Sequence, residues 1–96
     1  MIAYFENIRG GQLGPGVKEL KGCRAVQCRF GNPAVASVYA ISCSDSAQGR
    51  AVLREMGVER IGDETRMGDE TERLVERALA NDDDALMEIR EREWFD

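Results

Sequence analysis

The sequence of 96 residues contains no histidine and no long run of apolar residues. Without histidine, the chain lacks the most common general base of enzymes and the most common zinc ligand. Its apolar stretches are far shorter than the ~18 residues that a membrane-spanning helix needs. We therefore expect neither a self-contained enzyme with catalytic residues nor a membrane protein.

Cysteine is scarce, with Cys23, Cys28 and Cys43 only, and the first residues show no basic segment followed by an apolar stretch. Such a start predicts no signal peptide and a cytoplasmic location, where thiols stay reduced. Cys23 and Cys28 are five positions apart, so on one strand their side chains point to opposite faces and cannot bind the same metal ion. We expect the cysteines to pack in the core, with no metal site and no cofactor.

Charge is distributed unevenly along the chain. Residues 1–50 carry three acidic and six basic side chains, a net charge of +3, whereas residues 51–96 carry 15 acids and seven arginines, a net charge of −8. The length fits one domain, and an apolar content of 43% is enough for a packed core. We predict a single domain, residues 1–96, with a basic β-rich part over 1–43 and an acidic helical part over 44–96.

Three segments have the apolar alternation or the β-branched and aromatic content of strands, namely residues 2–8, 23–30 and 34–43. The turn signal at residues 31–33 joins the second and third segments, which predicts an antiparallel hairpin. Because residues 34–43 are nearly all apolar or small, we expect this strand to be buried on both faces and central in its sheet.

A helix is predicted over about 46–56. The segment Ser44-Asp45-Ser46 offers three candidate N-caps, and Gly57 is a typical end. Gly49 falls on the buried stripe of this helix, where glycine costs about 1 kcal/mol of helix propensity. Its presence there indicates that the helix approaches the sheet closely.

A short repeat precedes the second predicted helix, in which residues 62–67 (GDETRM) are followed by residues 68–73 (GDETER). We interpret the first copy as a loop and the second as the start of a helix that ends near residue 80. A third helix follows over about 83–94, capped by Asp83 or Asp84. Residues 58–61 are interpreted as a short fourth strand or a packed linker.

These segments together predict an α+β fold. It consists of an N-terminal antiparallel sheet of three strands, or four if residues 58–61 pair, with one covering helix and a C-terminal helical pair beside the sheet.

Two segments resemble catalytic or phosphate-binding motifs but lack essential residues. In the glycine-rich loop, Gly11 and Gly16 have the spacing of a phosphate-binding loop, but Val17 stands where that loop requires lysine. Residues 43–46 offer a thiol and two hydroxyls after the third strand, with no histidine to activate them. Helix capping explains these residues without chemistry.

The acidic residues of the second and third helices are the most unusual feature. On the third helix, Asp84, Glu88 and Glu91 recur at i, i+4, i+7 and form one stripe. Carboxylates on successive helix turns lie about 5–6 Å apart, close to the phosphate spacing along a nucleic-acid strand. We therefore predict a surface that binds a basic protein, with two terminal aromatics as apolar anchors. Its residues are Asp69, Glu72, Glu76, Asp83, Asp84, Glu88, Glu91, Trp94 and Phe95.

The leading hypothesis is an inhibitor or regulator of a basic protein, in particular one that binds nucleic acid. In size and acidity the chain is similar to small anti-defence inhibitors of phages, including some anti-CRISPR proteins, that mimic nucleic acid. This similarity is one of composition and involves no family motif. The alternative is that the acidic stripe has no binding function and is only a solvated helical face.

Two other functions stay open as alternatives. One is a self-associating structural or accessory protein, whose acidic helices contact the basic hairpin of another copy. The other is a small RNA- or DNA-binding protein that uses the hairpin, in which Arg9, Arg24 and Arg29 together with Tyr4, Phe5 and Phe30 form a stacking platform. The net charge disfavours this last function.

Overall fold

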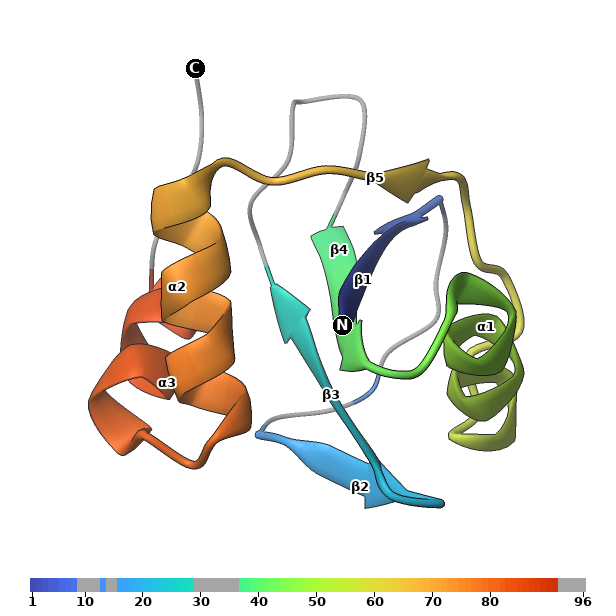
Figure 1. Cartoon of the computed structure of the whole chain (residues 1–96), viewed down its shortest axis with the longest axis horizontal. Coiled ribbons are helices and arrows are strands. Elements are labelled where there is room, and N and C mark those ends of the chain that lie inside the picture. Colours follow the sequence, from blue (N-terminus) through green and yellow to red (C-terminus); the bar gives the residue numbers. More distant parts are fainter. Residues whose placement is uncertain (9–12, 14–15, 29–36, 92–96) are drawn as a thin grey trace.

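The computed structural model describes residues 1–8, 13, 16–28 and 37–91. For residues 90 and 91 it describes the backbone only. In chain order the elements are β1 (Ile2–Asn7), β2 (Lys18–Leu20), β3 (Cys23–Cys28), β4 (Ser37–Ser42), α1 (Ser46–Glu55), β5 (Glu64–Thr65), α2 (Asp69–Leu79) and α3 (Asp83–Glu91). The strands form one antiparallel sheet in the order β2-β3-β4-β1-β5. Figure 1 shows α1 on one side of this sheet and the α2–α3 pair on the other, which makes three layers.

The α+β class is confirmed, but the sheet has five strands instead of the predicted three or four. The two missed strands, β2 and β5, are edge strands of three and two residues. Such short strands cannot show a period of two, and charge and glycine mark their surroundings as loops. Residues 58–61 form no strand, and β5 lies instead in the first copy of the repeat, which was predicted to be a loop.

The predicted hairpin and the position of its second strand are confirmed. β3 and β4 pair antiparallel, with Ala25 opposite Ile41 and Cys28 opposite Val38. β4 is the middle strand of the sheet, as its apolar sequence predicts, and five of its six residues are buried. The turn at 31–33, together with Arg29 and Phe30, lies outside the described residues.

The two faces of the sheet contribute to two separate cores. Phe5, Tyr39 and Ile41 point to the α1 side, where they pack with Val52 and Leu53. The alternate residues of the same strands point to the other side and pack under α2 and α3. The helical pair therefore covers the second face of the sheet. The sequence analysis had predicted that the pair packs beside the sheet.

The predictions for α1 are confirmed. Asp45 is its N-cap, and the carboxylate accepts a hydrogen bond of 2.8 Å from the N–H of Gln48. Gly49 faces the sheet so closely that a Cβ atom there would lie 3.1 Å from both Sγ of Cys43 and Cγ2 of Ile41. Gly57 ends the helix with a φ of +103°, in the left-handed region that favours glycine.

The two copies of the hexapeptide repeat fold differently. Gly62, in the first copy, donates its N–H to the carbonyl of Glu6 at 2.7 Å, which draws the chain onto β1 as it enters β5. Gly68, in the second copy, is the N-cap of α2, and a Cβ atom there would meet nothing within 4 Å. Tertiary contact with β1 therefore decides which copy is extended.

The N-cap of α3 lies one residue before the nearer of the two predicted caps, Asp83 and Asp84. Asp82 caps the helix, because its carboxylate accepts hydrogen bonds from the N–H groups of Asp84 and Ala85 at 3.1 and 3.2 Å. The two predicted caps, Asp83 and Asp84, are instead the first two residues of α3. Asn81, with a φ of +68°, supplies the turn between α2 and α3. The predicted end of the helix near Trp94 lies outside the described residues.

Candidate interaction site

Three of the predicted partner-binding carboxylates lie together on one side of α2. Asp69, Glu72 and Glu76 are spaced i, i+3, i+7 and are exposed. Leu74 and Val75, on the other side of the helix, are buried in the core between α2 and the sheet. The helical period thus separates a core-facing side of α2 from an acidic side, as the sequence predicts.

These carboxylates border a surface hollow of about 330 Å³, which we call the α2–β1 hollow. The pairing of β5 with β1 spans only Tyr4 and Phe5, so Ile2 lies beyond the paired part of that edge. The hollow therefore combines the first strand of the chain with a helix from its second half. Its lining residues are Ile2, Tyr4, Asp69, Glu72, Arg73 and Glu76.

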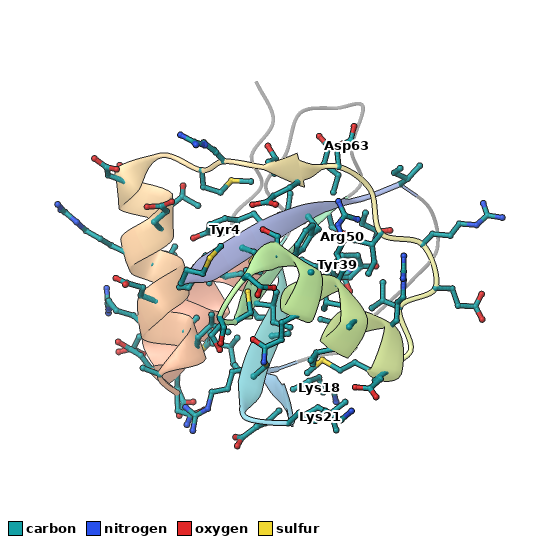
Figure 2. All side chains as sticks on the ribbon, turned by 45° about the vertical axis from the view of Figure 1, so that its right-hand side comes forward. Tyr4, Lys18, Lys21, Tyr39, Arg50 and Asp63 are labelled. Atoms are coloured by element: carbon teal, nitrogen blue, oxygen red, sulfur yellow. The ribbon has the colours of Figure 1, made fainter. Side chains whose placement is uncertain are left out.

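Tyr4 is the most buried residue of this lining, with 3% of its surface exposed. It lies between β1 and α2 (Figure 2), and its hydroxyl is buried with no hydrogen-bond partner among the described residues. Burial raises the pKa of this hydroxyl far above its ordinary value, and the nearby Glu72, Cys28 and Glu76 raise it further. The hydroxyl is therefore neutral at physiological pH and able to donate and to accept a hydrogen bond.

The charged groups of the α2–β1 hollow form no ion pair with another described residue. The ion pairs in the described part of the chain lie elsewhere on the surface. They do not involve the four charged residues of the lining, which are Asp69, Glu72, Arg73 and Glu76. Three carboxylates against one guanidinium give the hollow a net negative charge. These carboxylates can therefore bind an external cation without breaking an internal contact.

The predicted carboxylates of α3 lie apart from this hollow. Asp83, Asp84 and Glu88 are exposed on α3 and do not contribute to the lining. Beside them, Asp82 forms an ion pair of 2.9 Å with Arg77. A hydrogen bond from the N–H of Ala85 and one from Arg77 lower the pKa of Asp82. This part of the acidic surface is thus partly neutralised, and it serves to join the two helices.

The structure describes no side chain for the other three predicted residues, Glu91, Trp94 and Phe95. Glu91 is the last residue of α3, and only its backbone is described. Trp94 and Phe95 lie outside the described residues. Their predicted part as apolar anchors stays a prediction.

Two cations near the edge of the sheet, Lys21 in the turn between β2 and β3 and Arg24 on β3, have partners within the protein. Lys21 forms an ion pair of 2.7 Å with Glu55 of α1. Arg24 lies 3.4 Å from the carboxylate of Glu19 and donates a hydrogen bond to the carbonyl of Leu79 at the end of α2. These contacts tie the hairpin to the helices on both faces of the sheet.

The cysteines lie where the sequence analysis placed them. All three are free and buried, with Cys23 and Cys43 in the core under α1 and Cys28 in the core under α2 and α3. Burial raises the pKa of the Cys28 thiol to about 12. Among the residues with described positions, no group of three His, Cys, Asp or Glu side chains is arranged to hold a metal ion.

Sequence analysis missed three residues of the α2–β1 hollow, Ile2, Tyr4 and Arg73. Ile2 and Tyr4 were assigned to a strand, and Tyr4 was considered only as a stacking or core aromatic. No local pattern connects them with the carboxylates of α2, because the sequence separation between them is large and only the tertiary fold brings them together. The alternating pattern of β1 does place Ile2 and Tyr4 on one face.

Comparisons with known proteins identify no relative. The chain matches no family model, no curated protein and no solved structure. None of the described helices has the length and apolar character needed to cross a membrane. A functional hypothesis for this protein therefore depends on the geometry and charge of the site itself.

Proposed function

We propose that this protein is a small interaction module that inhibits or regulates a basic protein by binding it through the acidic side of α2. The observation that carries the proposal is the cluster of exposed carboxylates around the α2–β1 hollow, which form no ion pair with a described residue. Such carboxylates attract a basic surface from a distance and accelerate association with it. The hollow offers a recess into which a partner side chain can insert, which a flat acidic face does not.

The partner class that we propose is a cytoplasmic protein with a basic nucleic-acid-binding groove. Glu72 and Glu76 are one helical turn apart, which places them about 5–6 Å from each other, close to the phosphate spacing of a nucleic-acid strand. Asp83, Asp84 and Glu88 extend the negative surface onto α3. Inhibitors of the phage anti-defence type are one example of proteins that use such a surface.

The two alternative functions receive less support. Arg24 of the predicted basic hairpin is engaged with Glu19 and with the carbonyl of Leu79, and Arg29 lies outside the described residues. Tyr4 and Phe5 are buried, so neither offers an open face on which a base could stack. We therefore rank self-association and direct nucleic-acid binding below the binding of a basic protein.

The test compares two charge-reversed proteins with the same net charge. Glu72→Lys/Glu76→Lys changes the acidic side of α2, and Glu59→Lys/Glu64→Lys changes two exposed acids elsewhere, Glu59 after α1 and Glu64 on β5 opposite Phe5. Each protein is used to capture partners from nuclease-treated lysate, with low-salt and high-salt washes and mass spectrometry. A recovered partner is then titrated in the presence of competing DNA or RNA.

The expected result is a salt-sensitive basic partner that the α2 variant loses and the control variant retains. Competing nucleic acid should reduce the binding of wild-type protein to that partner. If both variants lose the partner equally, the effect is one of overall charge. If the α2 variant still binds the partner fully, this site is ruled out. Recovery of the bait alone would favour the self-associating accessory protein.

A further inference from the structure

The buried hydroxyl of Tyr4 gives the α2–β1 hollow a chemical requirement that the surrounding acids alone do not. A buried polar group without a partner is unfavourable, and proteins generally satisfy such groups. Within the described residues, no donor or acceptor reaches the Tyr4 hydroxyl. Tyr4 is a lining residue of an open hollow, and its hydroxyl lies close enough to Glu72 and Glu76 for their charges to raise its pKa. A group bound between these carboxylates can therefore supply the missing hydrogen bond once it reaches the hydroxyl.

The charges of the lining determine what kind of group this is. Carboxylates only accept hydrogen bonds, and Asp69, Glu72 and Glu76 outnumber Arg73. An anion is repelled by this lining, and a neutral group leaves the carboxylates without a counter-charge. A cation that carries several N–H groups can donate to the carboxylates and to the oxygen of Tyr4 at the same time.

The geometry favours a guanidinium over an ammonium group. Glu72 and Glu76 are one turn apart on α2, and Tyr4 belongs to β1, so the acceptors come from two different elements that border the hollow. The planar guanidinium has five N–H donors in a fixed fork, whereas an ammonium is a compact point charge. Ile2 adds an apolar part to the lining, against which the methylene groups of an arginine can pack.

We propose that the α2–β1 hollow is a binding site for the guanidinium group of an arginine side chain, which the basic partner inserts on docking. This inference rests on the proposed function for the source of the arginine. The recognition of a guanidinium group by Tyr4 and the carboxylates of α2 does not depend on which protein is the partner. Free guanidinium compounds and protein side chains share this chemistry, and the experiment separates them.

The experiment uses two-dimensional NMR of the full chain, titrated with defined probes. These are Nα-acetyl-arginine amide, its lysine and citrulline counterparts, and the peptide Gly-Gly-Arg-Gly-Gly with blocked ends. Citrulline has the shape of arginine without the charge. We expect the arginine probes to shift the amides of Ile2, Tyr4, Glu72 and Glu76, the lysine probe to bind more weakly, and the citrulline probe to have no effect at equal concentration.

Point variants test the individual groups. Tyr4→Phe removes only the hydroxyl and should weaken arginine binding about two- to ten-fold, the loss of one hydrogen bond. Glu72→Gln should weaken it by a similar or larger factor. Arg73→Gln removes the competing cation and should tighten binding about two- to five-fold. Glu59→Gln, an exposed acid outside the hollow, should leave the affinity unchanged.

Folding of the key variant is checked by thermal unfolding. Because Tyr4→Phe deletes a buried hydroxyl that has no hydrogen-bond partner among the described residues, the variant should melt at the same temperature as the wild type or higher. A loss of arginine binding in that variant therefore reports the site and not the fold. Melting well below the wild type would show that the hydroxyl has a partner within the protein, and would overturn the proposal.

The remaining outcomes separate the site from the proposed function. Equal binding of citrulline and arginine, or unchanged affinity in Tyr4→Phe, would overturn the guanidinium site even if a basic partner is captured. Binding of the small amide but not of the peptide would overturn the side-chain source and assign a free guanidinium ligand. Binding of both, without any captured partner, would support the site while the proposed function fails.

Discussion

Cys28 and Tyr4 show how burial changes the chemistry of single side chains in this protein. Both face the core under α2 and α3, with 0% and 3% of their surfaces exposed. Burial raises the pKa of the Cys28 thiol to about 12, because the thiolate would lose its hydration in an apolar core. Since the thiolate is the nucleophilic form, Cys28 is unreactive at neutral pH and contributes to packing.

The raised pKa of Cys28 predicts a loss of stability in alkaline solution. The unfolded chain releases the thiol proton above its ordinary pKa of 9.0, whereas the folded chain keeps it until about 12. The contribution of Cys28 is therefore fully present below pH 9 and falls by about 1.4 kcal/mol per pH unit between the two values. Urea unfolding between pH 8 and 11 should show a shallower pH dependence for Cys28→Ala than for the wild type.

A neighbouring substitution provides the control for this prediction. Val26→Ala empties space in the same core without removing an ionisable group, so it should lower the free energy of unfolding equally at every pH. If Cys28→Ala also shifts the curve without changing its slope, then the thiol ionises in the folded protein near its ordinary pKa. The raised pKa values of Tyr4 and Tyr39 add to the slope in all three proteins above pH 10.

Among the secondary-structure elements, β5 and α2 show how nearly identical sequences acquire different structures. The two copies of the repeat share the letters GDET, and their glycines have opposite surroundings. At Gly62, a Cβ atom would lie 2.7 Å from the carbonyl oxygen of Glu6 and 2.8 Å from Cγ1 of Ile8. At Gly68, the corresponding position is open. The first glycine is therefore required by close packing on β1, whereas the second occupies the N-cap of α2, where no neighbouring atom excludes a side chain.

This difference predicts opposite effects of substituting the two glycines. Gly62→Ala should push the chain away from β1 and lower the free energy of unfolding by about 1–3 kcal/mol, the usual cost of overpacking. Gly68→Ser places a preferred N-cap residue in open space and should leave stability unchanged or raise it by up to about 1 kcal/mol. Chemical denaturation measures both, and similar losses in the two variants would contradict the assigned packing.

The amide exchange of β1 gives a second readout for Gly62→Ala. The N–H of Glu6 donates to the carbonyl of Asp63 at 3.0 Å, and this bond depends on the segment that Gly62 positions. The amide of Glu6 should therefore exchange faster in the variant than in the wild type. The amide of Phe5, which points to β4 because successive residues of β1 alternate in direction, should change less.

At the scale of the whole molecule, the two cores are joined by the sheet that they share. Ile41 and Ala40 are neighbours in β4, yet Ile41 packs under α1 and Ala40 under the α2–α3 pair. Substitutions in either core should therefore destabilise the same central strand. We expect one cooperative unfolding transition, as is usual for chains of this size.

Matched substitutions on the two faces test this cooperativity. Leu53→Ala lies in the core under α1 and Leu74→Ala in the core under α2 and α3. Each should lower the free energy of unfolding by about 2–5 kcal/mol and reduce the exchange protection of β4 amides by the same amount. Local melting of α2 and α3 in Leu74→Ala, with β4 protection unchanged, would instead show that the helical pair unfolds as a separate unit.

The sequence by itself determined the features that depend on neighbouring residues. Apolar periodicity located β1, β3, β4 and the helices, and the run of small and apolar residues identified β4 as the central strand. Asp45, Gly49 and Gly57 predicted the start, the sheet contact and the end of α1. The acidic side of α2 also followed from its period, because residues three and four positions apart share a side of a helix.

Only the tertiary structure decided the features that depend on contacts between distant segments. Two short edge strands form because longer neighbours supply their partners, and a segment of two or three residues carries no pattern of its own. The α2–β1 hollow exists because the second face of the sheet is covered by α2, which brings Tyr4 under Glu72 and Glu76. A local pattern cannot encode such a site, since its acids and its hydroxyl lie on elements that meet only after the chain has folded.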